Sequence, residues 1–241
     1  MFKKLLHQFT RNRETDAQLA YDLWSKDYDN QPDNLMLALD SVVFANLLQN
    51  IAIQHKTIID VGCGTGRHWP LLLDQHPAQL IGYDVSEGML QVLNKKFPLA
   101  LTYMLKGNSL AQTTYHSADL LISTLTIAHI ENARSAMEEW DRVVKPGADI
   151  IITDYHPDIL QKGGKRTFKT GGRTISVKNY IHATAQIRSM ASSLGWVLEE
   201  TIERKVDDSV KHFYEKQNAL AVFEAYKGMP VIYGFHFIKS V

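Results

Sequence analysis

Short apolar runs alternate with longer amphipathic segments through the first two thirds of the chain. The runs are predicted as strands from their apolar character, and the first has the β-branched, continuous apolar residues Ile58, Ile59 and Val61 that are typical of a sheet buried on both faces. The runs lie at 57–61, 79–84, 101–105, 118–124 and 148–154. The amphipathic segments are predicted as helices, at 16–25, 35–54, 67–75, 87–96 and 132–143. This alternation predicts a doubly wound α/β fold around a mostly parallel sheet.

The pattern changes after His156. A hairpin is predicted over 166–177 with its turn at Gly171-Gly172, and a helix over 178–194 follows it. The remainder is typical of a strand, a helix and a last strand, at 196–205, 207–226 and 230–239. We therefore expect one domain over 1–241, built from a helical lid segment, a cofactor-binding core and a substrate-side region that completes the sheet, at 1–56, 57–157 and 158–241.

The most informative residues follow the first predicted strand, where an acid, Asp60, is followed by three alternating glycines, Gly62, Gly64 and Gly66. Glycine adopts backbone angles that other residues avoid, and it lets a ligand approach without meeting a Cβ atom. A helix is predicted directly after the turn. The unit of strand, glycine turn and helix is either a purely structural turn or a site for a nucleotide-like cofactor.

The glycine spacing differs from that of a dinucleotide site. A dinucleotide fingerprint reads Gly-x-Gly-x-x-Gly, whereas here the third glycine arrives one residue early and Arg67 takes the sixth position. A carboxylate at Asp60, beside the turn, would repel a pyrophosphate and favour a cationic ligand. Both features count against NAD or FAD.

A second acid, Asp84, ends the next apolar run, eighteen residues after Gly66. In doubly wound nucleotide-binding folds, an acid at this point accepts hydrogen bonds from ribose hydroxyls. Ser86 is predicted to cap the helix that follows, which gives the same stretch a structural role as well. The two roles are compatible.

Four ordered motifs carry a family resemblance. They are Asp60-Val61-Gly62-Cys63-Gly64-Thr65-Gly66, Asp84-Val85-Ser86 with Met89-Leu90, Gly107-Asn108, and Val143-Val144-Lys145-Pro146-Gly147. From about Tyr21 to Pro157, the chain resembles the class I S-adenosylmethionine-dependent methyltransferases. It is most similar to their small-molecule, ubiquinone-biosynthesis-like (methyltransferase type 11) group. The resemblance implies a Rossmann-like sheet of seven strands whose last strand is antiparallel, with a small insertion after the fifth strand.

The resemblance also implies the cofactor, S-adenosylmethionine, and the residues that bind it. Asp84 would hold the ribose hydroxyls and Val85 would press on the adenine, while Gly62, Cys63 and Gly64 would run along the methionine portion near Asp60. Ser123 and Thr124, at the end of the fourth strand, would lie beneath the methyl group.

One position departs from the family pattern. Asn108 stands where these enzymes usually carry an acid near the adenine amino group. The side-chain oxygen of Asn108 can still accept that hydrogen bond, and Ser109 or the backbone of Leu110 is the alternative.

Two tyrosines near the N-terminus, Tyr21 and Tyr28, match the aromatic segment that covers the cofactor in similar enzymes. Tyr28 lies between two aspartates in a polar stretch, where a core residue is not expected, and is predicted as part of the lid. Tyr21 fits a lid position and a buried helix face equally well.

Methyl transfer depends mainly on the position of the nucleophile, and a general base helps where a proton must leave. Two histidines follow predicted strands at the end of the sheet where substrate should arrive. His129 comes after the fourth strand and His156 after the fifth. Each is a candidate base, and each has a structural alternative, as a first-turn helix residue or as a loop-fixing residue beside Pro157.

Composition narrows the partners. The 241 residues carry no formal net charge and are 45% hydrophobic, so no overall field favours nucleic acid or an anionic membrane. One cysteine, Cys63, fits a reducing cytoplasm. Residues 1–13 lack the apolar stretch of a secretory signal and are expected to form a solvated lead-in. Metal ligands beyond Asp154 and His156 are missing at short spacing, so no metal is expected.

The sequence therefore predicts a cytoplasmic methyltransferase acting on a small molecule, with an oxygen nucleophile of a natural product or quinone-like metabolite as the leading acceptor. N- and C-methylation rank behind it. A non-catalytic S-adenosylmethionine-binding sensor or partner subunit is the alternative, and a nicotinamide oxidoreductase is a third reading. A homodimer is compatible with any of them.

Overall fold

The computed structural model describes residues 14–241, so the lead-in expected over 1–13 lies outside the described residues. Within this range, seven strands form one sheet in the order β3-β2-β1-β4-β5-β9-β8. The strands are β1 (Thr57–Val61), β2 (Gln79–Asp84), β3 (Leu101–Met104), β4 (Ala118–Thr124), β5 (Val144–Tyr155), β8 (Trp196–Lys205) and β9 (Pro230–Lys239). The first five are parallel, and β9 runs antiparallel to β5 and β8. The predicted fold, including the antiparallel last strand, is confirmed.

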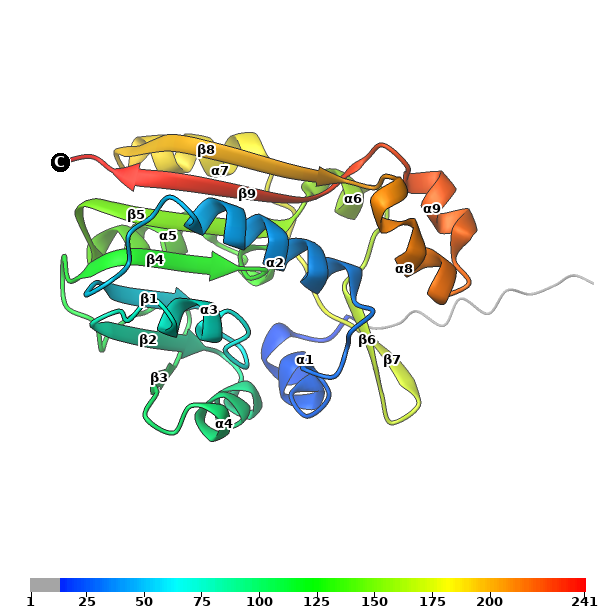
Figure 1. The fold of residues 1–241 in the computed structure, drawn as a ribbon, viewed down its shortest axis with the longest axis horizontal. Coiled ribbons are helices and arrows are strands. Elements are labelled where there is room, and N and C mark those ends of the chain that lie inside the picture. Colours follow the sequence, from blue (N-terminus) through cyan, green and yellow to red (C-terminus); the bar gives the residue numbers. More distant parts are fainter. Residues whose placement is uncertain (1–13) are drawn as a thin grey trace, which may run out of the picture.

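Helices cover both faces of the sheet (Figure 1). On one face lie α2 (Leu35–Leu48) and α3 (Trp69–Leu73), and on the other α5 (Ala133–Val143) and α7 (Thr184–Ser193). Each face has its own apolar layer: Phe44 and Leu47 of α2 are buried in the first, and Met137 and Trp140 of α5 in the second. The strands between these layers are buried on both sides, which explains their continuous apolar runs.

Polar residues at the predicted positions begin several helices. Asn34 caps α2, Ser86 caps α4 (Glu87–Lys96) and Asn132 caps α5, each accepting a hydrogen bond from a backbone N–H of the first turn. The cap predicted at Ser86 is therefore confirmed.

The lid and the insertion meet beside the carboxyl ends of the strands. The lid helix α1 (Ala17–Trp24) lies against the hairpin of β6 (Thr167–Thr170) and β7 (Arg173–Ser176), which follows the short helix α6 (Pro157–Gln161) (Figure 1). Trp24 stacks on Phe168 at 4.5 Å between ring centroids. Thr15 also exchanges backbone hydrogen bonds with Ser176 and Lys178. The two segments thus form one cap with a small apolar core of its own.

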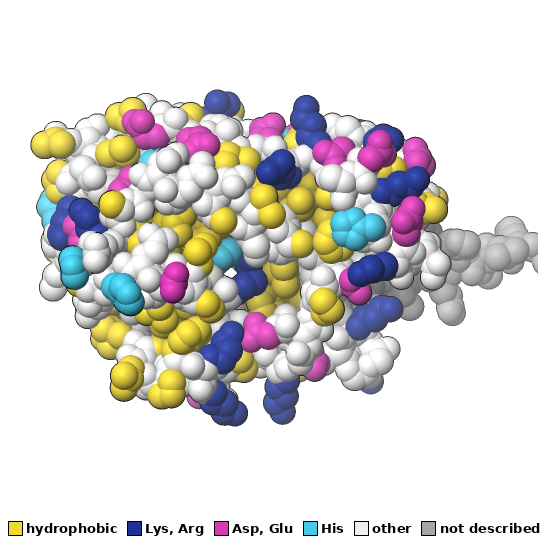
Figure 2. Space-filling model, in the orientation of Figure 1, with side chains coloured by type: hydrophobic (Ala, Val, Ile, Leu, Met, Phe, Trp, Pro, Cys, Tyr) yellow, Lys and Arg dark blue, Asp and Glu magenta, His cyan; other side chains and the backbone are white. Residues whose placement is uncertain are grey.

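Several predicted boundaries are wrong. The helix expected over 178–194 begins only at Thr184, because the backbone N–H groups of Lys178 and Tyr180 donate to the carbonyls of Thr15 and Ala128 instead of to helical partners. The helix expected over 207–226 is broken into η2 (Asp208–Val210), α8 (Lys211–Lys216) and α9 (Leu220–Tyr226), and Asn218 between the last two has a positive φ of 53°. Figure 2 shows one face of the molecule, on which apolar side chains are exposed in several patches with charged side chains scattered between them.

Candidate active site

A cavity of about 690 Å³ lies over the carboxyl ends of β1, β2 and β4. β1 pairs with β2 on one side and with β4 on the other, so the cavity stands where the strand order reverses, which is the general ligand position in open α/β sheets. Its volume is in the range of small-molecule sites. Its walls come from the glycine turn, the ends of β2 and β4, the loop after β3, the cap, and the 3-10 helix η1 (Ile127–His129) with the residues that follow it.

The glycine turn is held close to its neighbours. Gly62 has a φ of 76°, and a Cβ atom at this position would lie 2.0 Å from Oγ1 of Thr126. Gly64 also has a positive φ, of 53°, but a Cβ atom there would meet nothing within 4 Å. The open space at Gly64 belongs to the cavity, so a ligand can approach the backbone at this point.

Asp84 ends β2 and Val85 follows it, and both line the cavity. The Asp84 carboxylate accepts hydrogen bonds from the backbone N–H groups of Gly64 and Ser86, both at 2.8 Å. A carboxylate has about four acceptor positions, so two remain for donors of a ligand. Burial raises the pKa of Asp84 to about 6.

Asp60 lies under the glycine turn with one oxygen satisfied. Its Oδ2 accepts a hydrogen bond from the indole nitrogen of Trp69 at 2.9 Å, while its buried Oδ1 has no hydrogen-bond partner among residues 14–241. Burial raises its pKa to about 7. Asp60 faces a side chamber of about 30 Å³ that it shares with Gly64, Tyr28 and Thr124. A ligand that brings a cation or a donor to this chamber would satisfy the free oxygen.

The lid tyrosines both line the cavity. Tyr21 and Tyr28 meet edge to face at 6.4 Å, and Asp22 between them accepts hydrogen bonds from the Ser86 hydroxyl and the Gly88 backbone N–H at 2.6 and 2.9 Å. The lid is therefore anchored at the start of α4. Tyr21 faces the cavity, which the sequence left undecided.

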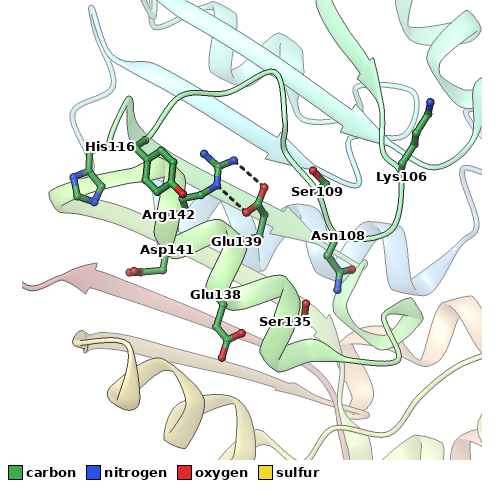
Figure 3. A pocket seen from close by; sticks show the side chains of 10 residues that line it. Lys106, Asn108, Ser109, His116, Ser135, Glu138, Glu139, Asp141 and Arg142 are labelled. Carbon is green, nitrogen blue, oxygen red and sulfur yellow. Dashed lines mark hydrogen bonds and ion pairs between the residues drawn. The ribbon is translucent and has the colours of Figure 1, made fainter.

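The loop after β3 places Asn108 on the cavity wall but turns the two alternatives away. Ser109 lines a separate surface hollow, and the N–H of Leu110 donates to Oε1 of Glu139 at 2.7 Å. Figure 3 shows Glu139 and Arg142 of α5 joined by two hydrogen bonds beneath this loop. The Leu110 N–H is engaged with Glu139 and its carbonyl with Arg142, so of these three residues Asn108 is the one that lines the cavity.

The surface hollow in Figure 3 has a volume of about 700 Å³ and shares Lys106 and Asn108 with the cavity. Two charged side chains on its wall, Arg142 and Glu139, already have partners within the protein. Arg142 pairs with Glu139 and also donates to the carbonyls of Leu110 and Thr113. Glu139 and Arg142 on the wall of this hollow therefore hold the loop that carries Asn108 in place.

The two candidate histidines have different surroundings. His156 is buried, caps α6 and lies 3.5 Å from Glu203; it does not line the cavity. His129 lines the cavity and approaches the Tyr21 hydroxyl at 2.9 Å through Nε2, while its Nδ1 meets the Lys178 carbonyl at 2.9 Å. Burial, together with nearby Arg166, holds the pKa of His129 well below its usual range.

Arg166, at the start of the hairpin predicted over 166–177, is not among the site residues that the sequence predicts. The structure buries it to 3% exposure. Its Nη2 pairs with Asp154 at 2.7 Å, and its Nη1 donates to the Leu125 carbonyl at 2.7 Å and contacts His129. A buried arginine on a polar hairpin has no periodic signal, so only the tertiary fold reveals it.

Two neighbouring predictions have simple outcomes. Cys63 is buried against Gly82, and burial raises the pKa of its thiol, so the residue offers its backbone to the turn. Thr124 and Val85 line the cavity, whereas Ser123 is buried beneath it and its hydroxyl has no partner among the described residues.

Within residues 14–241, no three or more His, Cys, Asp or Glu side chains form a group that could hold a metal ion. None of the helices in the same range has the length and apolar character needed to cross a membrane.

The fold and the cavity together define a doubly wound α/β protein with a ligand-sized site at its switch point. Comparison with known proteins agrees. The family described as "Methyltransferase domain" matches residues 59–152. An uncharacterized methyltransferase of Emericella nidulans is 26% identical over 79% of this chain and 81% of its own length.

Two further proteins are similar to this chain. An uncharacterized protein of Haemophilus influenzae is 28% identical over 63% of this chain. The matched part covers 61% of that relative's length. The magnesium protoporphyrin IX methyltransferase of Synechocystis, solved with bound SAH, superposes with a TM-score of 0.63 over 92% of this chain and 95% of its own, at 17% identity. This last likeness concerns the fold.

The methyltransferase domain over residues 59–152 and these relatives support a class I S-adenosylmethionine-dependent methyltransferase with S-adenosylmethionine as its cofactor. The predicted family, enzyme class and cofactor are confirmed.

Proposed function

We propose that the enzyme transfers the methyl group to an oxygen atom of a small molecule, a natural product or a quinone-like metabolite. The single observation that carries the proposal is the cavity, which is continuous from Asp84 at one end to Tyr21 and His129 at the other. One ligand-sized space thus reaches both the ribose end of the cofactor site and the aromatic underside of the cap. A site of this size, with Tyr21, Tyr28 and Tyr180 on its wall, suits a small acceptor.

The residues of the cavity fit the cofactor. We assign the ribose hydroxyls to Asp84, the adenine to Val85 and Asn108, and the methionine portion to Gly62, Cys63 and Gly64. Thr124 and the lid residue Tyr28 close this end. The free oxygen of Asp60 suits a donor or cation of the methionine portion, and the open space at Gly64 lets that portion pass close to the backbone.

The cofactor supplies an electrophilic methyl group on a positively charged sulfur. The chain's own residues position the two reactants and exclude water, which together account for most of the catalysis in this kind of transfer. The cap supports this assignment, because Trp24 stacks on Phe168 and on Tyr21, and Tyr21 lines the cavity. Of the two candidate histidines, only His129 lines the cavity, and we place it at the acceptor end.

Magnesium protoporphyrin IX methyltransferase, by its name, acts on a small molecule, and this supports a small acceptor here. The absence of net charge supports it as well, since nucleic-acid sites rely on clustered positive charge.

The proposal includes the division of the chain into a lid, a cofactor-binding core and a substrate-side region, over 1–56, 57–157 and 158–241.

A labelled-methyl screen tests the proposal. The protein is incubated with methyl-labelled S-adenosylmethionine and a metabolite extract separated into small-molecule, nucleic-acid and protein fractions. We expect label in the small-molecule fraction, and none with the Asp84→Ala variant. Label confined to nucleic acid or protein would contradict the proposed acceptor class.

A further inference from the structure

The acceptor end of the cavity offers a hydrogen-bond donor and no available base, as a count of lone pairs shows. The Lys178 carbonyl can only accept, so Nδ1 of His129 carries the proton and Nε2 has a single lone pair. Both the Tyr21 hydroxyl, at 2.9 Å, and Nη1 of Arg166 reach that one lone pair. Only one of them can donate to it.

Arg166 is the stronger competitor. Its guanidinium is charged and held in place by Asp154, by the Leu125 carbonyl and by the ring of Tyr155, which lies 4.2 Å from it. When Arg166 occupies the lone pair, the hydroxyl proton of Tyr21 is left free to point into the cavity. Nη1 of Arg166 also lies 3.2 Å from the Tyr21 oxygen, which polarises the hydroxyl further.

The same contacts make His129 a poor base. A proton on Nε2 would face the Arg166 cation in a buried site, and the pKa of His129 is held well below its usual range by burial and by this cation. Burial raises the pKa of Tyr21, although Arg166 opposes the shift, so Tyr21 remains protonated. Tyr28 and Tyr155 are the other titratable groups near the Tyr21 hydroxyl.

The other charged residues on the cavity wall are Asp16, Asp84, Lys106 and Glu131. Asp84 belongs to the cofactor end. Asp16 caps α1, and Glu131 is exposed and accepts a hydrogen bond from Tyr180. Carboxylates ionise about six pH units below a phenol, so they are weak bases for it.

We propose that the acceptor is a phenol or enol whose oxygen is ionised before attack, and that the Tyr21 hydroxyl, positioned by Arg166, binds this oxyanion. The inference rests on the proposed function and narrows its substrate class. The acceptor oxygen forms the new bond to the methyl carbon while the bond from sulfur to that carbon breaks and leaves its electron pair on sulfur. No proton has to leave at this step, so no protein base is needed.

The test uses binding, with 4-nitrophenol as the probe and its neutral ether 4-nitroanisole as the matched control. The ionised form of 4-nitrophenol is measured by its absorbance in protein saturated with S-adenosylhomocysteine. We expect the bound phenol to ionise at least about one pH unit lower than the free phenol, a preference of about tenfold for the anion. We expect 4-nitroanisole to bind at least about tenfold more weakly.

Variants separate this interaction from folding. Tyr21→Phe keeps the ring and should abolish the shift, Arg166→Met should reduce it, and Arg166→Lys should restore part of it. Tyr180→Phe, which removes a second cavity hydroxyl not backed by Arg166, should leave it unchanged. Calorimetry with S-adenosylhomocysteine checks that each variant still binds at the Asp84 end.

The outcomes are distinct. If the wild-type protein binds S-adenosylhomocysteine but not the phenolate, or if Tyr21→Phe leaves the shift intact, the oxyanion site is overturned and the cofactor assignment stands. If the wild-type protein binds neither S-adenosylhomocysteine nor S-adenosylmethionine, the proposed function itself fails, and the inference fails with it.

Discussion

Two buried carboxylates, Asp60 and Asp84, set the electrostatics of the cofactor site. Removing a charge from water is unfavourable unless it gains partners. Burial accordingly raises the pKa of Asp60 to about 7 and that of Asp84 to about 6. In the cofactor-free protein the folded state then holds protons that the unfolded state releases, so stability should decrease as pH rises from about 4 to about 7.

The cofactor reverses this preference, because its sulfonium and ammonium groups and its ribose hydroxyls interact best with ionised carboxylates. We expect the affinity for S-adenosylmethionine to weaken as pH falls through about 7 and then about 6, by up to about tenfold per pH unit for each proton taken up. Calorimetry across this range measures it. Asp60→Asn should flatten the upper part of the curve; an affinity that stays constant from pH 8 down to about 5.5 would speak against this role of the two carboxylates.

At the scale of elements, the glycine turn and η1 are fitted to each other. Gly62 packs against Thr126, just before η1, while Gly64 faces open space in the cavity. The sequence predicts the turn, the strands on either side and the helices that begin at Ser86 and Asn132, because glycine, β-branched and capping residues act locally. Thr126 carries no such local signal.

The two glycines give a matched pair of variants. Gly62→Ala places a methyl group against Thr126 at a positive φ, so we expect it to lower the free energy of unfolding by about 3 kcal/mol or more. Gly64→Ala has only the backbone cost of about 1–2 kcal/mol, but its methyl group enters the cavity and should weaken S-adenosylmethionine binding at least about tenfold. Chemical denaturation and calorimetry separate the two effects. Equal stability losses in both variants would contradict this packing.

What the sequence could not predict at this scale depends on contacts between distant segments. The helix expected over 178–194 starts late because Tyr180 bonds to Ala128, and Arg166 reaches Asp154 and His129 only after the hairpin folds back. Ser109 and Leu110 turn away from the cavity because Glu139 of α5 binds the loop. None of these partners is near in sequence.

At the scale of the whole molecule, one buried aspartate connects three layers. Asp40 of α2 accepts hydrogen bonds from Arg67 after the glycine turn, from His68 at 3.0 Å and from Thr153 of β5. Burial alone would raise the pKa of Asp40, but Arg67 and His68 hold it below its usual range. The helix that covers the sheet is thereby fixed to the turn that carries the cofactor.

Replacing Asp40 should therefore destabilise the entire fold. We expect Asp40→Asn to lower the free energy of unfolding by about 3–5 kcal/mol, because Arg67 and His68 lose their charged partner in a buried site. Asp33→Asn, which removes an exposed ion pair with Lys216, should cost less than about 1 kcal/mol. Urea denaturation measures both.

The pH dependence of this contribution has a definite sign. Because the pKa of Asp40 is lowered on folding, its stabilisation is present above about pH 4 and is lost as the pH falls further. The difference between wild type and Asp40→Asn should shrink in acid. A difference that grows instead would show that the network is not held by the ionised carboxylate.

The assignment of the cavity to S-adenosylmethionine is tested most directly by calorimetric titration of the wild-type protein and of Asp84→Ala with this cofactor. The cavity geometry predicts saturable binding at one site per chain in the wild type. Loss of the ribose acceptor should weaken that binding at least about tenfold, equivalent to about 1.4 kcal/mol. Equal affinity in the two proteins would contradict the placement of the cofactor over Asp84.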